Sequence, residues 1–493
     1  MPKSKQTRAR KRSAKGHDEK ASKAQKVSST PLSVCGSDVR ICHLSNDVAF
    51  ASPPLNLSES DGFGKFISIL VDWSLCDNDQ RGYDPSMDSA DEHGGWLIQC
   101  ADVETGETNV YVSTAELASS DRLFGRHTRC FIAKQQIRGA DGSTSYGPPV
   151  VVKDSWPSKL TDSALDETEL LRMINDKLPK HAEGVMYPKL LACECVAFNY
   201  SSTGDVSNDT TTSILGNLHD DEDSEVSEDK HYIWFRGHKR YVTSPVGERL
   251  GTARSFDELA AAMADVMKTH EMARKHCDIL HRDISHNNMM IVREKDHVRG
   301  LLIDYDASIT QSELKEQSAP GRVGTFYCMS IGNLQNNTVP RTALDDWESL
   351  LYVICHYATT GVGSGRIVNW DEPAKRPIKK WVADSHDDAA LFKKQHLASE
   401  KAFKDNITSH FRKTDKGGEK MVALAKSLHT MLFFNPRLNW ICHGVDKRWG
   451  IIDGKRVYRD PFEARTENVD GIVNDLLAVM GQAQNSDIGG TSA

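Results

Sequence analysis

Long hydrophobic runs are absent from this 493-residue chain. The apolar stretch at residues 66–71 stops at Asp72 and is far shorter than the roughly 20 residues that cross a bilayer. No apolar stretch follows the basic N-terminus either, so the first residues do not have the pattern of a secretory signal. We therefore expect no membrane partner and an intracellular location, cytoplasmic or nuclear.

Regularly spaced cysteines are lacking as well. The eleven cysteines are scattered along the chain, whereas a disulfide-stapled domain has an even number at regular spacing. This pattern is typical of a reducing compartment. Cys193 and Cys195 are the one close pair, and because no second pair answers them, we interpret them as strand residues and not as zinc ligands.

Acids outnumber bases outside the first 27 residues. These contain ten lysines and arginines and two acids, a net charge of +8, whereas the whole chain has a net charge of −8. The remaining 466 residues therefore carry −16, which disfavours nucleic-acid binding by the body of the protein. Only the basic tail, with its cluster from Arg8 to Arg12, is a candidate for contact with nucleic acid or with a nuclear import receptor.

Shifts in composition divide the chain into five parts. Hydrophobic residues make up 39% of the chain, which is enough for a sizeable core. Residues 201–230 are rich in serine, threonine and acids, and we interpret them as an insertion in a loop. The predicted parts are a basic disordered tail and lead-in (1–59), a β-rich extension (60–118), a β-rich lobe with a hinge and the acidic insertion (119–247), a helical lobe (248–480) and a disordered tail (481–493).

The extension is predicted to consist of strands. The apolar run of residues 66–73 is a strand candidate, and residues 96–100 and 109–113 flank a hairpin-like turn at residues 104–107. The polar residues 77–95 are expected to form a loop. A sheet that starts in this extension is therefore predicted.

Helical patterns dominate after residue 250. Ser255 and Glu258 have the spacing of a capping box, and apolar residues follow at helical intervals. Residues 343–357 are largely apolar and predict a buried helix, and residues 469–480 predict a final amphipathic helix.

Residues 281–288 carry the chemistry. An aspartate followed five residues later by an asparagine, and introduced by His-Arg, is the catalytic-loop pattern of protein kinases, and His281, Arg282, Asp283 and Asn288 fit it. Phosphoryl transfer needs a carboxylate that orients the attacking hydroxyl and accepts its proton, and an oxygen ligand for a divalent cation. We assign these roles to Asp283 and Asn288, and we interpret His281 as structural.

A second carboxylate is predicted beside this loop. Residues 289–292, a polar turn and residues 301–303 have the pattern of a hairpin that ends at Asp304. Such a hairpin delivers Asp304 next to Asn288, so the two side chains together predict a Mg²⁺ site.

An upstream lysine and glutamate complete the set. Residues 150–152 predict a strand that ends in Lys153, comparable to the kinase lysine that holds the α- and β-phosphates. Glu167 has apolar residues three, four and seven positions later, which is the spacing of a buried helix face. Glu169 lacks this spacing, so we expect Glu167 to orient Lys153.

Two downstream residues fit the same order of elements. The hydroxyl of Thr325 lies where it can hydrogen-bond the catalytic carboxylate, and Asp346 opens the buried helix at residues 343–357. Asp346 resembles the helix aspartate that accepts hydrogen bonds from the catalytic-loop backbone. The whole order predicts an α+β, bilobal protein-kinase-like fold with a β-rich N-lobe and a helical C-lobe.

Six segments together resemble the fungal-type protein kinase family. They are residues 124–129, 153–156, 245–250, 280–285, 302–306 and 345–349. The resemblance implies ATP and Mg²⁺ as cofactors and transfer of the γ-phosphate to serine or threonine of a protein substrate. It also implies that Gly125, Lys153, Thr243 in the hinge and Asp304 contact the nucleotide.

Three positions depart from ordinary protein kinases. Gly125 is a single glycine where the usual phosphate loop has three, Ser285 stands in place of a lysine that touches the γ-phosphate, and Asp306 stands in place of a glycine. These departures leave two alternatives open. One is a small-molecule kinase of related fold, and the other is a pseudokinase scaffold that binds a nucleotide without turnover.

Overall fold

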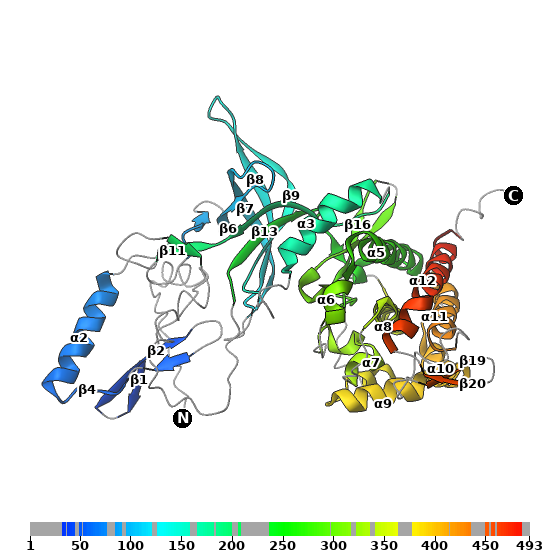
Figure 1. Ribbon diagram of the computed structural model, residues 1–493. Coiled ribbons are helices and arrows are strands. Elements are labelled where there is room, and N and C mark those ends of the chain that lie inside the picture. The colour runs from blue at the N-terminus through cyan, green and yellow to red at the C-terminus, as the bar shows by residue number, and fades with distance from the viewer. Residues whose placement is uncertain are drawn as a thin grey trace, which may run out of the picture. The chain divides into compact units, whose positions relative to one another are not determined.

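The chain divides into two units by its internal contacts. The first contains Met1–Leu160 and Leu191–Val242, and the second contains Thr161–Leu190 and Thr243–Ala493. In the computed structural model (Figure 1) the described residues are 32–35, 37–44, 49–51, 53–75, 84–90, 95–120, 126–157, 165–181, 184–199, 206–208, 236–295, 297–316, 322–335, 341–362, 377–413, 415–434, 449–452, 455–458 and 461–485.

Several sequence predictions fall on other residues. The basic tail up to residue 31, most of the acidic insertion and residues 486–493 lie outside the described residues. The same is true of Gly125.

The first unit is built mainly of strands. Its elements are β1 (Leu32–Cys35), β2 (Asp38–Leu44), β3 (Ala49–Ala51), β4 (Leu55–Asn56), α2 (Ser60–Leu75), β5 (Met87–Ala90), β6 (Gly95–Ala101), β7 (Thr108–Ser119), β8 (Arg129–Arg138), β9 (Thr144–Ser155), β10 (Lys189–Cys195), β11 (Ala197–Asn199), β12 (Val206–Asn208) and β13 (Lys239–Ser244).

A seven-stranded sheet in the order β10-β13-β9-β8-β7-β6-β5 forms the centre of this unit. β5 to β9 pair antiparallel in chain order, and the predicted hairpin between β6 and β7 is present. Alternate residues on these strands bury one apolar face, because successive side chains of a strand point to opposite sides. That face contains Ile98, Cys100, Tyr111, Phe131, Ala133, Val150, Val152 and Val242.

The strand predicted over residues 66–73 is wrong, because these residues lie in helix α2. A short apolar run does not by itself distinguish a strand from a helix. The helix starts against β4, where a Cβ on Gly62 would lie only 2.2 Å from the carbonyl oxygen of Asn56. Lys65 pairs with Asp61 one turn earlier at 2.7 Å, a spacing that only a helix provides.

The polar stretch at residues 77–95 also differs from its prediction, since it contains the short strand β5. Met87 of this strand is buried in the apolar face of the sheet. Across the described segments, no helix has both the length and the hydropathy that are needed to cross a bilayer.

The second unit is mainly helical. Its elements are α3 (Glu167–Lys177), η1 (Leu178–Lys180), β14 (Glu248–Arg249), η2 (Leu250–Thr252), α5 (Phe256–Cys277), β15 (Ile279–Leu280), β16 (Met289–Arg293), β17 (Val298–Leu302), η3 (Tyr305–Ala307), β18 (Ile309–Thr310), α6 (Gln311–Glu316), η4 (Phe326–Cys328), α7 (Ile331–Leu334), α8 (Ala343–Thr360), η5 (Pro377–Trp381), α9 (His386–Leu397), α10 (Glu400–Asn406), η6 (Thr408–His410), α11 (Gly418–Phe433), β19 (Trp449–Ile452), β20 (Lys455–Tyr458) and α12 (Pro461–Asn485).

Helices α5 and α8 form the centre of the second unit. The predicted buried helix is α8, which is capped by Thr342 and Asp345 in a capping box and buries almost every side chain. Helix α5 packs against β17, α11 and α12. Figure 1 shows α5 in green and α12 in red. The approach of β17 is close, because a Cβ on Gly300 would lie 1.9 Å from the carbonyl oxygen of Ala262. The predicted final helix lies within α12, which continues past residue 480 to Asn485.

A buried histidine makes the stability of this unit depend on pH. Nδ1 of His396 accepts a hydrogen bond from the indole N–H of Trp381 at 3.0 Å. Burial, helped by the charge of Lys380, lowers the pKa of His396 from 6.5 to about 4. The unfolded chain therefore binds a proton here more readily, so the free energy of unfolding falls as the pH drops from 6.5 towards 4.

We predict that the substitution His396→Asn flattens this dependence, because it removes the titrating group and keeps a hydrogen-bond acceptor. At pH 5 the histidine is expected to cost the folded state about 2 kcal/mol relative to pH 7. Urea unfolding at pH 5 and pH 7 measures the difference, with the exposed His410→Asn as the control. An equal change in the free energy of unfolding between pH 5 and pH 7 for His396→Asn and the wild type would contradict the assignment.

Candidate active site

The loop that carries Asp283 is anchored at both ends. Helix α5 begins after Ser255, whose hydroxyl accepts a hydrogen bond from the N–H of Glu258 at 3.2 Å, and it ends at Asp278 in the left-handed conformation, φ 65°. The predicted capping box is only half formed, because the Glu258 carboxylate accepts from the N–H of Arg254 instead of Ser255. The two-residue strand β15 then pairs with β18, and the loop runs from there to β16.

Both carboxylate oxygens of Asp283 accept hydrogen bonds. Oδ1 accepts from the backbone N–H of Thr325 at 2.7 Å, and Oδ2 accepts from Nδ2 of Asn288 at 2.8 Å. Asn288 also donates to the backbone carbonyl of Asp283 at 2.9 Å. These three contacts fix the orientation of the carboxylate. Thr325 makes its contact through the main chain, whereas the sequence suggested its hydroxyl.

A buried aspartate on α8 supports the backbone of the loop that carries Asp283. Oδ2 of Asp346 accepts from Nε2 of His270 on α5 at 2.7 Å and from the backbone N–H of Arg282 at 3.2 Å. Burial alone raises the pKa of Asp346, but the hydrogen bond and the charge of His270 outweigh it, and the pKa lies below its ordinary value. Asp346 is therefore a charged anchor, which matches the scaffold role expected for it.

Arg282 and His281 are held as parts of this scaffold. Arg282 has a φ of 64°, a strained conformation for a non-glycine residue, and its Nε donates to the carbonyl of Ala307 at 2.7 Å. Nε2 of His281 donates to the carbonyl of Ile303 at 3.1 Å, and Nδ1 accepts from the N–H of Asp283 at 3.3 Å. Burial lowers the pKa of His281, and both of its ring nitrogens are engaged by the backbone, so neither is available to take a proton from a substrate.

The predicted hairpin is present and brings Asp304 to the loop. β16 pairs antiparallel with β17, and the N–H of Ile303 donates to the carbonyl of Asn288 at 2.9 Å. Asp304 follows directly with a φ of 64°, so it has a strained backbone as well. Asp304 is thus the second residue after β17, one position beyond the backbone contact with Asn288.

Glu167 lies next to Asp304 at the start of α3. Its Oε1 accepts from the backbone N–H of Tyr305 at 2.9 Å, and the carboxylates of Glu167, Asp304 and Asp306 lie within 4.8 Å of one another. Glu169 has a different role, because it forms a capping box with Asp166. Oxygen-only ligand sets suit Mg²⁺, so the residues present fit the metal that the sequence predicts.

A pocket opens beside the Asp283 carboxylate. Arg282, Gly324, Thr325, Met329, Asn333 and Arg341 are among the residues that line it. Gly324 has a φ of 107°, and a Cβ there would lie 2.7 Å from the carbonyl oxygen of Arg282. Glycine is therefore required where this segment crosses the catalytic loop.

Two buried ionisable side chains, Lys393 and Glu348, hold the segment after Thr325, and sequence reasoning missed Lys393. Nζ of Lys393 on α9 donates to the carbonyls of Tyr327 at 2.8 Å and Met329 at 2.7 Å, and it lies 3.8 Å from the ring centroid of Tyr352. Glu348 on α8 accepts from the N–H of Ile331 at 2.7 Å. Lys393 is one of several lysines in its stretch of sequence, so no pattern distinguishes it before the fold is known.

Two of the remaining predicted site residues lie on β9 and β13. Lys153 belongs to β9 in the first unit, is only 7% exposed, and has its Nζ 5.8 Å from the ring centroid of Tyr241. Thr243 is the fifth residue of β13. Gly125 falls outside the residues for which a structure is described, so its predicted contact with the nucleotide stays a prediction.

The site therefore combines the oriented carboxylate of Asp283 with a cluster of three carboxylates, those of Glu167, Asp304 and Asp306. A family model of the fungal protein kinases matches residues 29–358, well over half of the chain. The chain therefore belongs to the fungal protein kinase family, as the sequence resemblance indicated. The search of curated proteins returned no match to this chain.

The mixed fold agrees with this family, since the described residues form several sheets, the largest with seven strands, and a set of packed helices. Membership implies a kinase and phosphoryl transfer in general.

We predict that Gly324→Ala weakens the site, because the new Cβ displaces the carbonyl of Arg282 and the backbone conformation becomes strained. The free energy of unfolding should fall by about 2 kcal/mol or more. Gly184→Ala is the matched control, since Gly184 also has a positive φ, 72°, but nothing within 4 Å of a Cβ. If urea unfolding shows the same loss of unfolding free energy for both variants, the close approach of a Cβ to the Arg282 carbonyl has no cost and the prediction is contradicted.

Proposed function

We propose that this chain transfers the γ-phosphate of ATP to serine or threonine hydroxyls of a protein, with Asp283 as the base. The observation that carries the proposal is the fixed orientation of the Asp283 carboxylate between Asn288 and Thr325. Each carboxylate oxygen can accept more than one hydrogen bond, so both retain capacity for an acceptor hydroxyl. A carboxylate in this position orients that hydroxyl and takes its proton as the new bond to phosphorus forms.

Two residues would hold Mg²⁺ in this scheme. Asp304 offers a carboxylate, and Asn288 offers Oδ1, because its Nδ2 is engaged by Asp283. Mg²⁺ supplies charge neutralisation for the phosphates when it is bound. Glu167 and Asp306 lie close enough to orient or supplement this ligand set.

The remaining roles come from the family resemblance. Lys153 would hold the α- and β-phosphates with Glu167 as its partner, Thr243 would border the adenine, and Gly125 would cover the phosphates. The bilobal arrangement belongs to the same set of predictions. A protein acceptor is favoured by the segment after Gly324. The N–H of Thr325 holds the start of this segment next to Asp283, and Lys393 holds it further on, at the carbonyl of Tyr327.

One observation favours a second candidate, a nucleotide-binding scaffold without turnover. Ser285 is completely buried, and among the described residues its Oγ has no hydrogen-bond partner. An ordinary kinase places a lysine at this position, and the hydroxyl cannot supply that charge. A scaffold would bind Mg-ATP but would not transfer phosphate.

We predict that Asp283→Asn lowers phosphoryl transfer by at least about 100-fold, because it removes the proton acceptor and keeps the shape of the side chain. Transfer of ³²P from labelled ATP to a mixture of generic proteins measures the effect. Equal labelling by the wild type and Asp283→Asn would contradict catalysis by this chain. Labelling that requires an added small metabolite would favour a small-molecule acceptor.

The variant Asp304→Ala separates binding from turnover. We expect it to abolish the Mg²⁺-dependent part of the thermal shift that ATP produces, because it removes the charged metal ligand. Glu294→Ala is the control, because it removes an exposed carboxylate from the turn between β16 and β17, outside the ligand set, and should retain the shift. An unchanged shift in Asp304→Ala would mean that the metal is held elsewhere.

A further inference from the structure

A cluster of buried charges lies next to Lys153 on β9. Val150, Val152 and Asp154 alternate along this strand and share its inner face, since Val150 and Val152 both belong to the apolar core. Lys153 therefore faces the other side of the sheet. Asp154 is completely buried, so a charge sits at the end of an otherwise apolar face.

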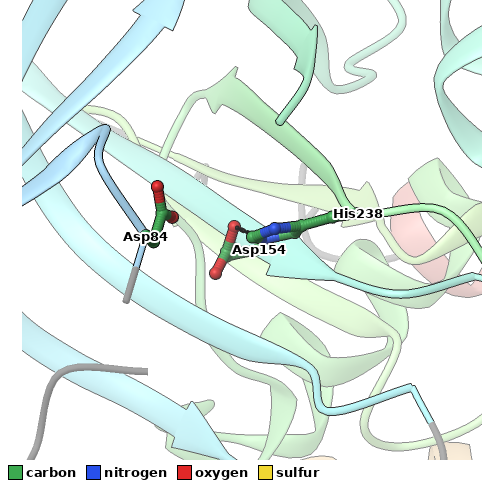
Figure 2. Close-up of side chains that lie close together, drawn as sticks. All are labelled: Asp84, Asp154 and His238. Atoms are coloured by element: carbon green, nitrogen blue, oxygen red, sulfur yellow. Dashed lines mark hydrogen bonds and ion pairs between the residues drawn. The ribbon is translucent and has the colours of Figure 1, made fainter. Parts of the chain in front are cut away.

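Asp154 is held by two residues that precede and begin β13. Its Oδ1 lies 2.8 Å from Nε2 of His238 and accepts from Nε of Arg240 at 3.1 Å. Arg240 also donates to the carboxylate of Asp84 and lies 3.4 Å from that of Glu194. Figure 2 shows Asp84, Asp154 and His238 converging, with the hydrogen bond between the last two drawn as a dashed line.

Three residues of this cluster have the ligand spacing of a metal site, but the positive charge between them is the guanidinium of Arg240. Ligand atoms of Asp84, Asp154 and His238 lie within 4.8 Å of one another. The guanidinium of Arg240 donates to both carboxylates, so it occupies the position that a metal would take. Burial raises the pKa of Asp154, yet the charges of Arg240 and His238 outweigh it and keep that pKa well below its usual range. The cluster is therefore an internal ion-pair network.

Residues that precede and follow Asp154 on the chain contact the same segment around β13. The ring of Trp156 stacks on His238 with 3.7 Å between centroids and 17° between planes. On the opposite face, Lys153 lies beside Tyr241, which is the neighbour of Arg240 on β13. The two strands thus place an ion pair on one face and the Lys153–Tyr241 contact on the other.

We propose that Asp154 is a positioning residue for Lys153: the pairing of its carboxylate with Arg240 and His238 fixes the end of β9 and thereby the direction of the lysine. The proposal rests on the proposed function, because Lys153 binds nucleotide phosphates only in that scheme. A purely structural ion pair would stabilise the first unit and leave the lysine unaffected.

A double-mutant cycle on nucleotide affinity tests this. The full-length chain is titrated calorimetrically with Mg²⁺ and a non-hydrolysable ATP analogue, in the wild type, Lys153→Met, Asp154→Asn and the double variant. We expect Lys153→Met to weaken binding by about tenfold or more, and Asp154→Asn by about tenfold. In the Lys153→Met background, Asp154→Asn should change the affinity by less than about twofold.

The measured affinities distinguish a failure of this inference from a failure of the proposed function. If Asp154→Asn weakens binding equally in both backgrounds, Asp154 does not act through Lys153 and the inference is overturned. If Lys153→Met leaves the affinity unchanged, the nucleotide role of Lys153 in the proposed function fails instead. Ser113→Ala is the stability control, because it removes the buried acceptor of the Trp96 N–H in the same sheet and should leave affinity unchanged.

His238→Phe gives a second route if Asp154→Asn does not fold. The phenyl ring keeps the stacking on Trp156 and removes the hydrogen bond to Asp154. We expect a weakening of about threefold that disappears in the Lys153→Met background. The same weakening in both backgrounds, or none in either, would overturn the proposal.

Discussion

The buried carboxylate of Asp346 is the constraint on which the second unit depends. It joins α8 to His270 on α5 and to the backbone of Arg282, so two central helices and the catalytic loop share one charge. The strained conformations of Arg282 and Asp304 persist because the surrounding contacts determine them. Asp283 gains its orientation from this frame, through Asn288 on one side and Thr325 on the other.

The two units treat clustered carboxylates in different ways. In the first unit, Arg240 lies among Asp84, Asp154 and Glu194, and the charges compensate one another inside the protein. In the second unit, Glu167, Asp304 and Asp306 converge around the turn that follows β17. Burying a charge is tolerable only when it is paired, and three converging carboxylates offer oxygen ligands of the kind that Mg²⁺ prefers.

The parts of the site that depend on short sequence distances could be predicted. Asp283 and Asn288 are five residues apart, and a hairpin pattern places Asp304 beside them, so the local sequence determines this geometry. Pairings such as Arg240 with Asp84 or Lys393 with Tyr327 join residues more than 60 positions apart, and no local pattern encodes them. The strand prediction is wrong for residues 66–73, which belong to helix α2, because a short apolar run of this kind fits a helix as well as a strand.

A crystal structure with Mn²⁺ and a non-hydrolysable ATP analogue tests the central claim most directly, because anomalous scattering locates the metal without reference to activity. The account predicts Mn²⁺ bound to Asp304 and Oδ1 of Asn288, with the Asp283 carboxylate still held by Asn288 and Thr325. Mn²⁺ bound to Asp84, Asp154 and His238, with Arg240 displaced, would contradict it.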